Sequence, residues 1–321
     1  MAGGDVMTRP IADLVDSYIA LRRGLGYRSA TQERSMRAFA RYLEGSEGPI
    51  PLESTLEWAT ATSSADPRNP ARRLATVRGL LRYLHSLDGA TDVPTPGLLG
   101  PIGQRNPPHV YSDAEIADLL GGAANLTPPG GLRPRCYVTL FGLLACTGLR
   151  ISEALALSCD DVDLGGGVIT VRAGKRGLTR LVPLHASAVA ALADYARERE
   201  QRCGPSGPDE AFFRTEASKR ISYNAAQHAF CVVRRRLGWS ANGRARAPRI
   251  HDLRHRMVVR RIQTWHAEGV DVDAKVSALA TYVGHVEVRD VYWYLSAVPE
   301  LMSIVAQRFE AFGEQLPIGV Q

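Results

Sequence analysis

A segment rich in proline and glycine constrains the fold of this chain more than any other feature. The stretch PTPGLLGPIGQRNPPH, residues 94–109, contains five prolines and three glycines. Proline removes a backbone donor and clashes with the preceding helical turn, so a helix does not continue through such a stretch. We therefore predict a linker over residues 94–110 between two domains, and a chain of 321 residues is long enough for both.

The part before the linker has the pattern of a helical domain, which we assign to residues 9–93. Apolar residues recur there at the i, i+3, i+4 and i+7 spacing of a helix that buries one face. One such stripe is Ile11, Leu14, Val15, Tyr18 and Ile19, and another is Leu74, Val77, Leu80, Leu81 and Leu84. We expect residues 1–8 to be disordered.

The part after the linker begins with a helix start near Tyr111. Ser112, followed three residues later by Glu115, has the pattern of a capping box, in which the two side chains satisfy the first free amides of a helix. We therefore assign the second domain to residues 111–321.

The second domain also contains a short run of strand-like sequence. Val168–Arg172 and Leu178–Leu184 are joined by the glycine-flanked segment Ala173–Gly177, a pattern that indicates a β-hairpin. The flanking residues 135–157 and 186–313 are predicted to be helical, with breaks at glycine and proline. The predicted fold class is mainly α, with a small antiparallel β-sheet in a mixed second domain.

Composition and cysteine usage exclude several classes of protein. Hydrophobic residues make up 45% of the chain and charged residues 22%, as in soluble globular proteins. The longest apolar run, residues 136–146, is too short to cross a bilayer, and the first residues lack the pattern of a secretion signal. Five cysteines without a C-x-x-C spacing argue against a disulfide framework and a thiolate zinc site, and a reducing cytoplasm fits them.

Positive charge is concentrated in one stretch of the chain. Between Arg214 and Arg261 there are thirteen lysines and arginines and two acidic residues, although the net charge of the whole chain is only +6. Such density repels itself unless a polyanion neutralises it, which favours nucleic acid as a partner. A smaller island, Arg68 to Arg82, has five arginines and no acid, and a solvated face is an equal alternative for it. The candidate DNA-binding residues are Arg72, Arg73, Arg78, Lys219, Arg220, Arg234, Arg235, Arg244 and Arg246.

Several polar residues of the second domain occupy positions that packing alone does not explain. Arg150 follows an apolar helix, and its ordinary role would be a surface ion pair with Glu153. Lys175 is at the tip of the predicted hairpin, where a lysine usually only solubilises the turn. His251 and Arg254 share one helical face, which beside a phosphate would offer a proton-transfer group and a bidentate fork.

His251 and His255 have the i, i+4 spacing of two zinc ligands on one helix face. No third ligand follows at a suitable spacing, and a cation would be poorly placed in so basic a stretch. We therefore expect no metal and no cofactor.

The stretch GHVEVRDVYWYLSAVPE, residues 284–300, contains two tyrosines that helical geometry separates. Val288, Val291, Tyr292 and Leu295 fit one apolar helix face, so Tyr292 is predicted to be a core residue. Two positions along a helix correspond to about 200° of rotation, so Tyr294 points away from that face. If one of them is exposed for reaction, it is Tyr294.

The ordered set of short motifs resembles the tyrosine recombinase, or phage integrase, family. The boxes are Thr147-Gly-Leu-Arg150-Ile-Ser-Glu153, Gly174-Lys175 with Arg180-Leu-Val-Pro183, His251-Asp-Leu-Arg254-His255, and Gly284-His285 with Tyr294. They span nearly the whole second domain, and the helical first domain is similar to the family's core-binding, SAM-like arm. The Ser/Thr pair often found between the last histidine and the tyrosine is replaced here by Tyr292-Trp293.

The resemblance implies a catalytic set and a reaction. Tyr294 would attack the scissile phosphate and hold the 3′ end as a phosphotyrosine, with no metal or ATP. Glu153 would orient neighbouring groups, and the catalytic residues would be Arg150, Lys175, His251, Arg254, His285 and Tyr294.

The resemblance also implies partners and a location. We expect double-stranded DNA sites as substrate, a homotetramer on DNA, a monomer when free, accessory recombinases as further partners, and the bacterial cytoplasm at the nucleoid. The apolar stripe of the tail, residues 299–312, closes either its own core or that of a neighbour.

Two alternatives stay open at this point. One is relaxation of supercoils in the manner of a type IB topoisomerase, and the other is a DNA-binding protein that has lost catalysis. The separate helical arm and the spacing of the boxes favour recombination over relaxation. The target sequence and the choice among integration, excision, dimer resolution and transposition are not encoded in these motifs.

Overall fold

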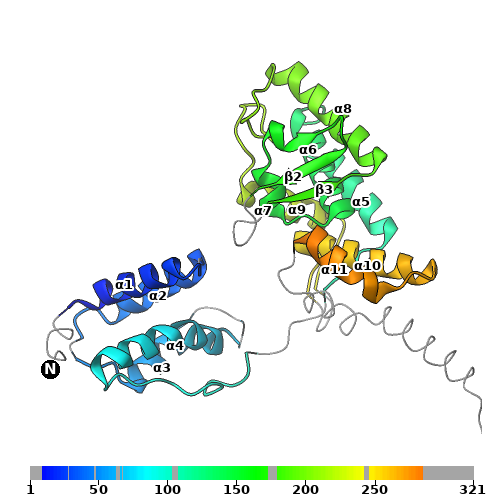
Figure 1. Ribbon diagram of the computed structural model, residues 1–321. Coiled ribbons are helices and arrows are strands. Elements are labelled where there is room, and N and C mark those ends of the chain that lie inside the picture. The colour runs from blue at the N-terminus through cyan, green and yellow to red at the C-terminus, as the bar shows by residue number, and fades with distance from the viewer. Residues whose placement is uncertain are drawn as a thin grey trace, which may run out of the picture. The chain divides into compact units, whose positions relative to one another are not determined.

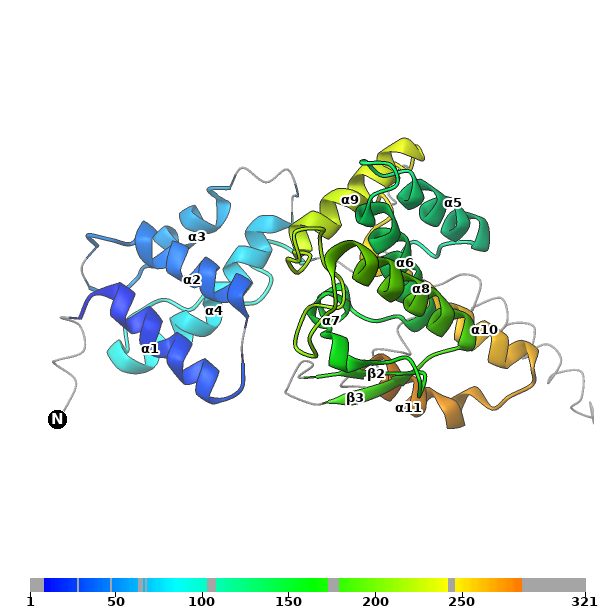
Figure 2. The ribbon, with the colours of Figure 1, turned by 90° about the horizontal axis from the view of Figure 1, so that it is seen from above.

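The structure is a computed structural model that describes residues 9–27, 29–46, 48–62, 66, 68–102, 108–172, 179–241 and 246–284. The chain divides into two compact units, residues 1–105 and 106–321. Figures 1 and 2 show the helical first unit and the mixed second unit. The roles of the two units as a DNA-binding arm and a catalytic domain stay predictions.

The first unit consists of helices packed around one core. Its helices are α1 (Ile11–Gly24), α2 (Ala30–Tyr42), α3 (Leu52–Thr60) and α4 (Asn69–Asp88). The two apolar stripes expected from the sequence supply most of the buried residues of α1 and α4. Phe39 and Trp58 fill the space between α2 and α3, with ring centroids 4.9 Å apart. Burial of these stripes is the main contribution that stabilises the unit.

The second unit is built around α6. Its helices are α5 (Asp113–Ala124), α6 (Leu132–Thr147), α7 (Ile151–Ala156), α8 (Ala186–Cys203), α9 (Tyr223–Arg236), α10 (Ile250–Ala267) and α11 (Val272–Val283), with a 3₁₀ turn at Cys159–Asp161. Helix α6 is apolar on nearly every side, and α5, α8 and α10 pack against it. The capping box predicted at Ser112 and Glu115 is present and starts α5.

One predicted helix is divided in two. The sequence predicted a helix over residues 135–157, whereas α6 ends at Thr147 and α7 begins at Ile151. Gly148 caps α6 with a φ of +66°, a left-handed conformation that glycine adopts without a steric penalty and that stops a right-handed helix. The break is what places Arg150 at a helix start instead of within a helix.

A small antiparallel sheet covers one side of the second unit. Its strands are β1 (Val162–Asp163), β2 (Val168–Val171) and β3 (Arg180–Pro183), in the order β1-β2-β3. Val168 pairs with Pro183 and Val171 with Arg180, which confirms the predicted strand pair, although both strands are shorter than expected. Helix α11 contacts β3 (Figures 1 and 2). The predicted turn, with Lys175, lies outside the described residues.

A separate apolar cluster joins α10 to α11. It contains Val258, Ile262, Val276 and Leu279, all nearly or fully buried. This packing holds α10 against α11. Among the helices that the structure describes, none has the length and apolar character needed to span a membrane.

Candidate active site

The turn between α6 and α7 positions Arg150. Gly148 ends α6, and a Cβ added to it would lie 3.3 Å from the Sδ of Met257 on α10. Arg150 is the N-cap residue of α7, and its backbone amide donates to Glu153 Oε2 at 2.9 Å. The glycine therefore sets the direction in which the chain leaves α6, and the cap fixes the backbone of Arg150.

Glu153 binds two arginines from different elements. Arg150 Nη1 donates to Glu153 Oε1 at 2.7 Å. Arg180 on β3 donates through Nη2 to Oε2 at 2.8 Å and through Nη1 to Oε1 at 3.2 Å. The exposed fractions of the side chains are 9% for Glu153, 11% for Arg180 and 28% for Arg150. Of the two guanidinium groups, that of Arg150 is the one more open to a ligand.

The Glu153 carboxylate is strongly held in its ionised form. Burial alone would raise its pKa, but hydrogen bonds from Arg180, from the Arg150 amide and from the Arg150 side chain outweigh burial and lower the pKa to about 2. The cluster therefore contains two cations and one anion near neutral pH. The surplus positive charge is what a phosphate would require.

The same two arginines hold the end of α11. Arg180 Nε donates to the carbonyl of Tyr282 at 3.0 Å, and Arg150 Nη2 donates to the carbonyl of Gly284 at 2.8 Å. Gly284 caps α11 with a φ of +71°. A Cβ added to Gly284 would lie 2.7 Å from Nη1 of Arg180, closer than real Cβ contacts. Glycine at this position allows the guanidinium of Arg180 to lie against the backbone.

Helix α10 brings a second arginine to the α6–α7 turn. Arg254 is 2% exposed, and its Nη1 donates to the carbonyl of Gly148 at 2.7 Å. Gly148 is two residues before Arg150, so the two arginines approach one turn from elements more than a hundred residues apart in sequence. The structure thus brings together Arg150, Arg254 and Glu153 in the described part of the second unit.

His251 lies one turn before Arg254 on the same helix. It is exposed, and its ring meets that of the buried His255 edge to face, with centroids 4.7 Å apart. Desolvation by the surrounding protein, followed by the positive charges of Arg254, Arg249 and Arg150, lowers the pKa of His251 against a smaller opposing effect of Asp252. The imidazole is therefore neutral at pH 7 and able to accept a proton. Among the residues that the structure describes, no group of acidic, histidine or cysteine side chains could hold a metal ion.

Four of the predicted site residues lie outside the described residues: Lys175, Arg244, His285 and Tyr294. Gly284 is the last described residue before His285. The predicted roles of these residues stay predictions.

Contacts with the start of the second unit hold α10 in place, and the sequence pattern does not predict them. The hydroxyl of Tyr111 donates to the carbonyl of Arg249, the N-cap residue of α10, at 3.0 Å. Arg256 donates through Nε to the carbonyl of Tyr111 at 3.0 Å, and Arg260 pairs with Asp113 at 2.6 Å. These contacts tie the start of the second unit to the helix that carries His251 and Arg254 and so hold that helix in place. Their partners are about 140 residues apart, so no local pattern reveals them.

The candidate DNA-binding arginines of the first unit differ in their surroundings. Arg72 pairs with Asp66 at 2.9 Å and is partly exposed. Arg73 stacks on the Trp58 ring at 4.1 Å and donates to the Trp58 carbonyl at 2.6 Å. Arg78 is half-buried. The contacts of Arg73 are those of a packing residue, so its prediction as a DNA contact is the weakest of the three.

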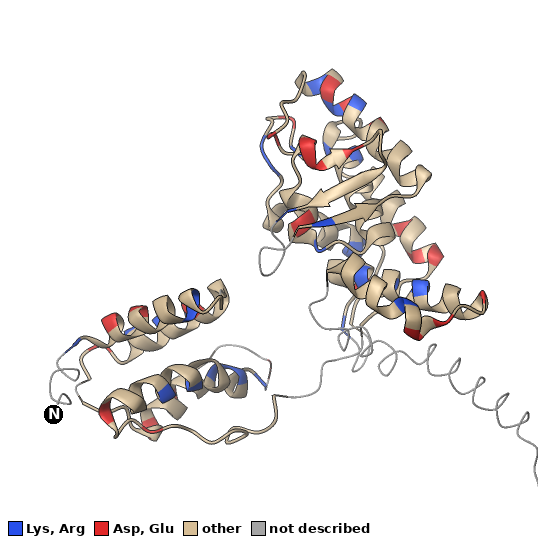
Figure 3. Cartoon of the chain, viewed as in Figure 1, with Lys and Arg blue, Asp and Glu red and all other residues tan. Residues whose placement is uncertain are grey.

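The candidates of the second unit divide in the same way. Arg220 donates to two backbone carbonyls at the end of α7, at 2.7 and 3.0 Å, and Arg234 donates to a carbonyl before α10 at 3.2 Å. Lys219, Arg220, Arg235 and Arg246 are exposed, whereas Arg234 is half-buried. Figure 3 colours the lysine and arginine positions along the chain, including those on α10 and α4. The exposed residues are the better candidates for contact with a polyanion.

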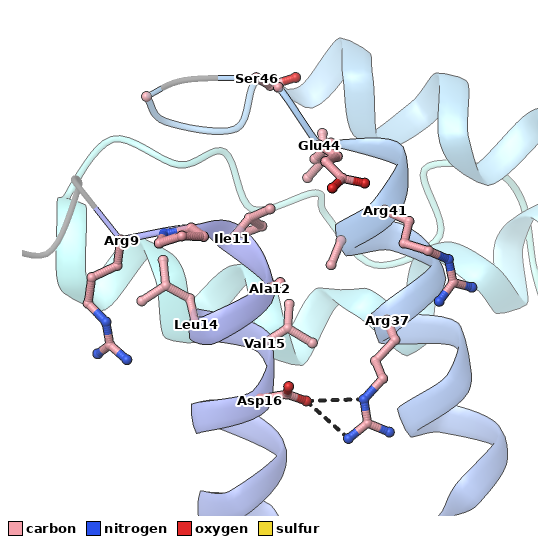
Figure 4. Close-up of a pocket in the computed structure, with 15 residues that line it drawn as sticks. Arg9, Ile11, Ala12, Leu14, Val15, Asp16, Arg37, Arg41, Glu44 and Ser46 are labelled. Carbon is pink, nitrogen blue, oxygen red and sulfur yellow. Dashed lines mark hydrogen bonds and ion pairs between the residues drawn. The ribbon is translucent and has the colours of Figure 1, made fainter.

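A hollow in the first unit is a separate feature. It has a volume of about 750 Å³ and is lined by residues of α1, α2 and their adjoining loops (Figure 4). Arg37 and Asp16 in its wall form an ion pair at 3.0 Å, and Arg9, Arg41 and Glu44 surround it. None of the predicted catalytic residues lines it.

The fold and the site are those of a mainly helical protein of two units, whose second unit brings together arginines, a buried carboxylate and a neutral histidine. Comparison with known families agrees. The model of the phage integrase family matches residues 112–300, more than half of the chain. The chain therefore belongs to the phage integrase family of tyrosine recombinases, which act in site-specific DNA recombination.

Individual proteins are similar over most of the chain. The protein y4rB of Sinorhizobium fredii (strain NBRC 101917 / NGR234), an integrase/recombinase by its name, is 37% identical over 300 residues, covering 92% of this chain and 96% of that protein. Tyrosine recombinase XerD of Bifidobacterium longum (strain NCC 2705) is 27% identical over 299 residues, covering 89% and 92%.

Solved structures show the same fold. The Tn1549 transposon integrase in complex with a circular intermediate DNA superposes with a TM-score of 0.64 at 16% identity, covering 89% of this chain and 95% of that one. A lambda integrase tetramer bound to a Holliday junction gives a TM-score of 0.59 at 14% identity, covering 88% and 79%. The mainly helical fold with a small antiparallel sheet is thereby confirmed.

Proposed function

We propose that this chain is a site-specific recombinase that cuts and rejoins DNA through a 3′-phosphotyrosine intermediate, without metal or ATP. The observation that carries the proposal is the approach of Arg150 and Arg254 to one turn, beside a carboxylate that holds Arg150 and a histidine that is neutral at pH 7. Family membership supplies the reaction class, and these contacts indicate which side chains of this chain would perform it.

Arg150 and Arg254 bind the two non-bridging oxygens of the scissile phosphate in this proposal. Each guanidinium presents a planar fork that matches a phosphate, a task for which lysine is poorly shaped. Glu153 and Gly284 take two of the five donors of Arg150, so three remain for the ligand. As negative charge develops in the transition state, such preorganised donors stabilise it.

Tyr294 is the proposed nucleophile. Its phenolic oxygen forms a bond to phosphorus while the bond from phosphorus to the 5′-oxygen breaks, leaving the 3′-phosphate on the tyrosine. Free tyrosine has a pKa near 10, so a base must take its proton during attack. His251, with a lowered pKa, is the proposed acceptor.

Two further roles rest on the family's pattern alone. Lys175 would donate a proton to the leaving 5′-oxygen, and His285 would donate a hydrogen bond to a phosphate oxygen. The reverse sequence, with the 5′-oxygen as nucleophile and Tyr294 as leaving group, rejoins the strand. The energy of the phosphodiester is conserved in the phosphotyrosine, so no ATP is needed.

The proposed substrate is double-stranded DNA, bound by several copies of the chain. The high local positive charge between Arg214 and Arg261 supports a phosphate-rich partner. A homotetramer on DNA is proposed from the fold shared with the lambda integrase tetramer on a Holliday junction. The fold shared with the Tn1549 transposon integrase keeps transposition among the candidate tasks.

A covalent trap tests the proposal. Short nicked duplexes of random sequence are incubated with the full chain, so that cleavage next to the nick releases a fragment and leaves the protein attached to DNA. We expect an adduct that resists denaturant and forms in the presence of EDTA, that is retained by Tyr292→Phe and is absent in Tyr294→Phe. An adduct that survives in Tyr294→Phe and is lost in Tyr292→Phe would reverse the assignment of the nucleophile.

The same substrate separates the two alternatives. A catalytically silent DNA-binding protein would bind the duplexes and give no adduct with any variant. A type IB topoisomerase would relax a supercoiled plasmid that lacks the sequence selected by the trap, whereas we expect the recombinase to require that sequence.

A further inference from the structure

Arg180 is outside the predicted catalytic set, yet its guanidinium makes three hydrogen bonds within the site. Both terminal nitrogens of its guanidinium donate to Glu153, and its Nε donates to the Tyr282 carbonyl. The side chain is only 11% exposed. Because its fork is closed on the Glu153 carboxylate and its Nε binds a carbonyl, the guanidinium of Arg180 is not available to bind a phosphate directly. Its contribution must therefore pass through the groups it touches.

The first group that Arg180 affects is Arg150. If Glu153 were paired with Arg150 alone, the carboxylate would cancel the charge that a phosphate needs. Because Arg180 also pairs with Glu153, the three side chains together keep one net positive charge. Arg150 is the more exposed of the two arginines, so this surplus charge is presented at the side chain that faces solvent.

The second group is the end of α11. Arg180 holds the Tyr282 carbonyl and Arg150 holds the Gly284 carbonyl, so one cluster fixes two of the last carbonyls of the helix. Arg180 lies so close to Gly284 that a Cβ at residue 284 would clash with the guanidinium. A shift of the Arg180 guanidinium would therefore affect the backbone at Gly284, and a shift of that backbone would affect the guanidinium.

We propose that Arg180 is a positioning residue of the recombination site: it shares Glu153 with Arg150, so that the three side chains keep a net positive charge, it holds Arg150 oriented toward the phosphate, and it anchors the Tyr282–Gly284 end of α11. The inference rests on the proposed function, because it assigns Arg150 to the phosphate. Arg180 itself touches neither phosphate nor nucleophile. Its loss should therefore slow the chemical step more than it weakens DNA binding, most of which comes from other phosphate contacts.

The test compares Arg180→Gln and Arg180→Lys with the control Arg172→Gln. Arg172 is an arginine of the same β-hairpin that also pairs with carboxylates, Asp160 and Asp161, but is 59% exposed and does not contact Glu153. For each full-length variant, single-turnover adduct formation is measured on the nicked duplex selected by covalent capture with the wild type. The Kd for the same duplex is measured by fluorescence anisotropy.

We expect Arg180→Gln to lower the rate of adduct formation about 10- to 100-fold, by analogy with the loss of a group that orients a metal ligand in other proteins, with the Kd unchanged. Arg180→Lys keeps the charge beside Glu153 and loses the fork, so its rate should be intermediate. Arg172→Gln should react like the wild type. Arg180→Gln at the wild-type rate, or Arg180→Lys no better than Arg180→Gln, would overturn the proposal.

Hydrogen exchange of the backbone amides of Thr281–Gly284 gives a reading that needs no activity. We expect faster exchange there in Arg180→Gln than in Arg172→Gln, because the anchoring of α11 is lost only in the first. If the wild type forms no adduct, the proposed function fails, while this comparison still reports on the anchor. Equal exchange rates of these amides in Arg180→Gln and Arg172→Gln would contradict the proposal that Arg180 anchors α11, even if both variants form adducts. Should Arg180→Gln not fold, Arg180→Lys is compared with Arg172→Gln in the same way.

Discussion

Replacement of the buried carboxylate, Glu153→Gln, is the perturbation for which the structure gives a magnitude. The pKa of Glu153 is lowered from 4.5 to about 2, and at about 1.4 kcal/mol per pKa unit this corresponds to about 3 kcal/mol in favour of the ionised form. The amide removes that anion and leaves Arg150 and Arg180 facing each other. We expect the free energy of unfolding at pH 7 to fall by about 3 kcal/mol, in line with the loss of one partner of a buried ion pair.

The effect should depend on pH in one direction. Because the pKa of Glu153 is lower in the folded chain than in the unfolded chain, its contribution is fully present above about pH 4.5 and is lost as the pH falls toward 2. The difference in unfolding free energy between the wild type and Glu153→Gln should therefore shrink over that interval. Glutamine does not titrate, so the variant itself lacks this part of the pH dependence.

Urea unfolding followed by far-UV circular dichroism measures both effects. The matched control is Glu268→Gln, an exposed carboxylate at the C-terminal end of α10, whose unfolding free energy should stay within about 0.5 kcal/mol of the wild type. A Glu153→Gln variant as stable as this control at pH 7 would refute the reasoning. So would a deficit that does not shrink between pH 4.5 and pH 2.

Three further outcomes are expected. Arg254→Ala should lower the rate of adduct formation by about 100-fold or more, as for other charge-stabilising donors, whereas a loss confined to the Kd would contradict a role in the chemical step. The pKa of His251 is lower than that of an ordinary histidine, so the rate should hold to a lower pH than it would with an unperturbed imidazole as base. A rate that declines with a midpoint at or above 6.5 would contradict this. Arg73→Ala should destabilise the first unit by about 1 kcal/mol or more in urea unfolding, because it loses its stacking on Trp58 and its hydrogen bond. Arg235→Ala should leave the stability unchanged and reduce the salt dependence of DNA binding by about one phosphate contact. The reverse pattern would contradict the structural assignment of the two arginines.

The helices of the first unit could be predicted because their pattern is local. The stripes from Ile11 to Ile19 and from Leu74 to Leu84 are the faces that the folded unit buries. The capping box at Ser112 was equally readable, since both partners are three residues apart. The spacing of apolar residues predicts each helix and its buried face even when the helix it packs against is not known.

The break at Gly148 was not predicted because the surrounding residues favour a helix. The glycine could have continued a helix at modest cost. The helix ends at Gly148 because the turn packs against Met257 on α10, a contact that cannot be predicted from the sequence. The ion pair of Arg150 with Glu153, in contrast, was visible from their spacing, and the structure contains it.

The role of Arg180 in the site required three-dimensional information. Its partners are Glu153, 27 residues earlier, and Tyr282, 102 residues later. Charge density alone also gave a mixed list of DNA-binding candidates, because it does not distinguish Arg73, packed on Trp58, from the exposed Arg235. Packing residues and exposed candidates are distinguished by contacts between residues far apart in the sequence, and the pattern of a single sequence does not reveal such contacts.

Mass spectrometry of the trapped protein–DNA adduct tests the central claim most directly. After digestion with protease and nuclease, the account predicts a peptide in which Tyr294 carries a nucleotide linked through its 3′-phosphate, formed equally well in EDTA. A nucleotide on Tyr292 or on any other residue, or an adduct that requires a divalent metal, would contradict it.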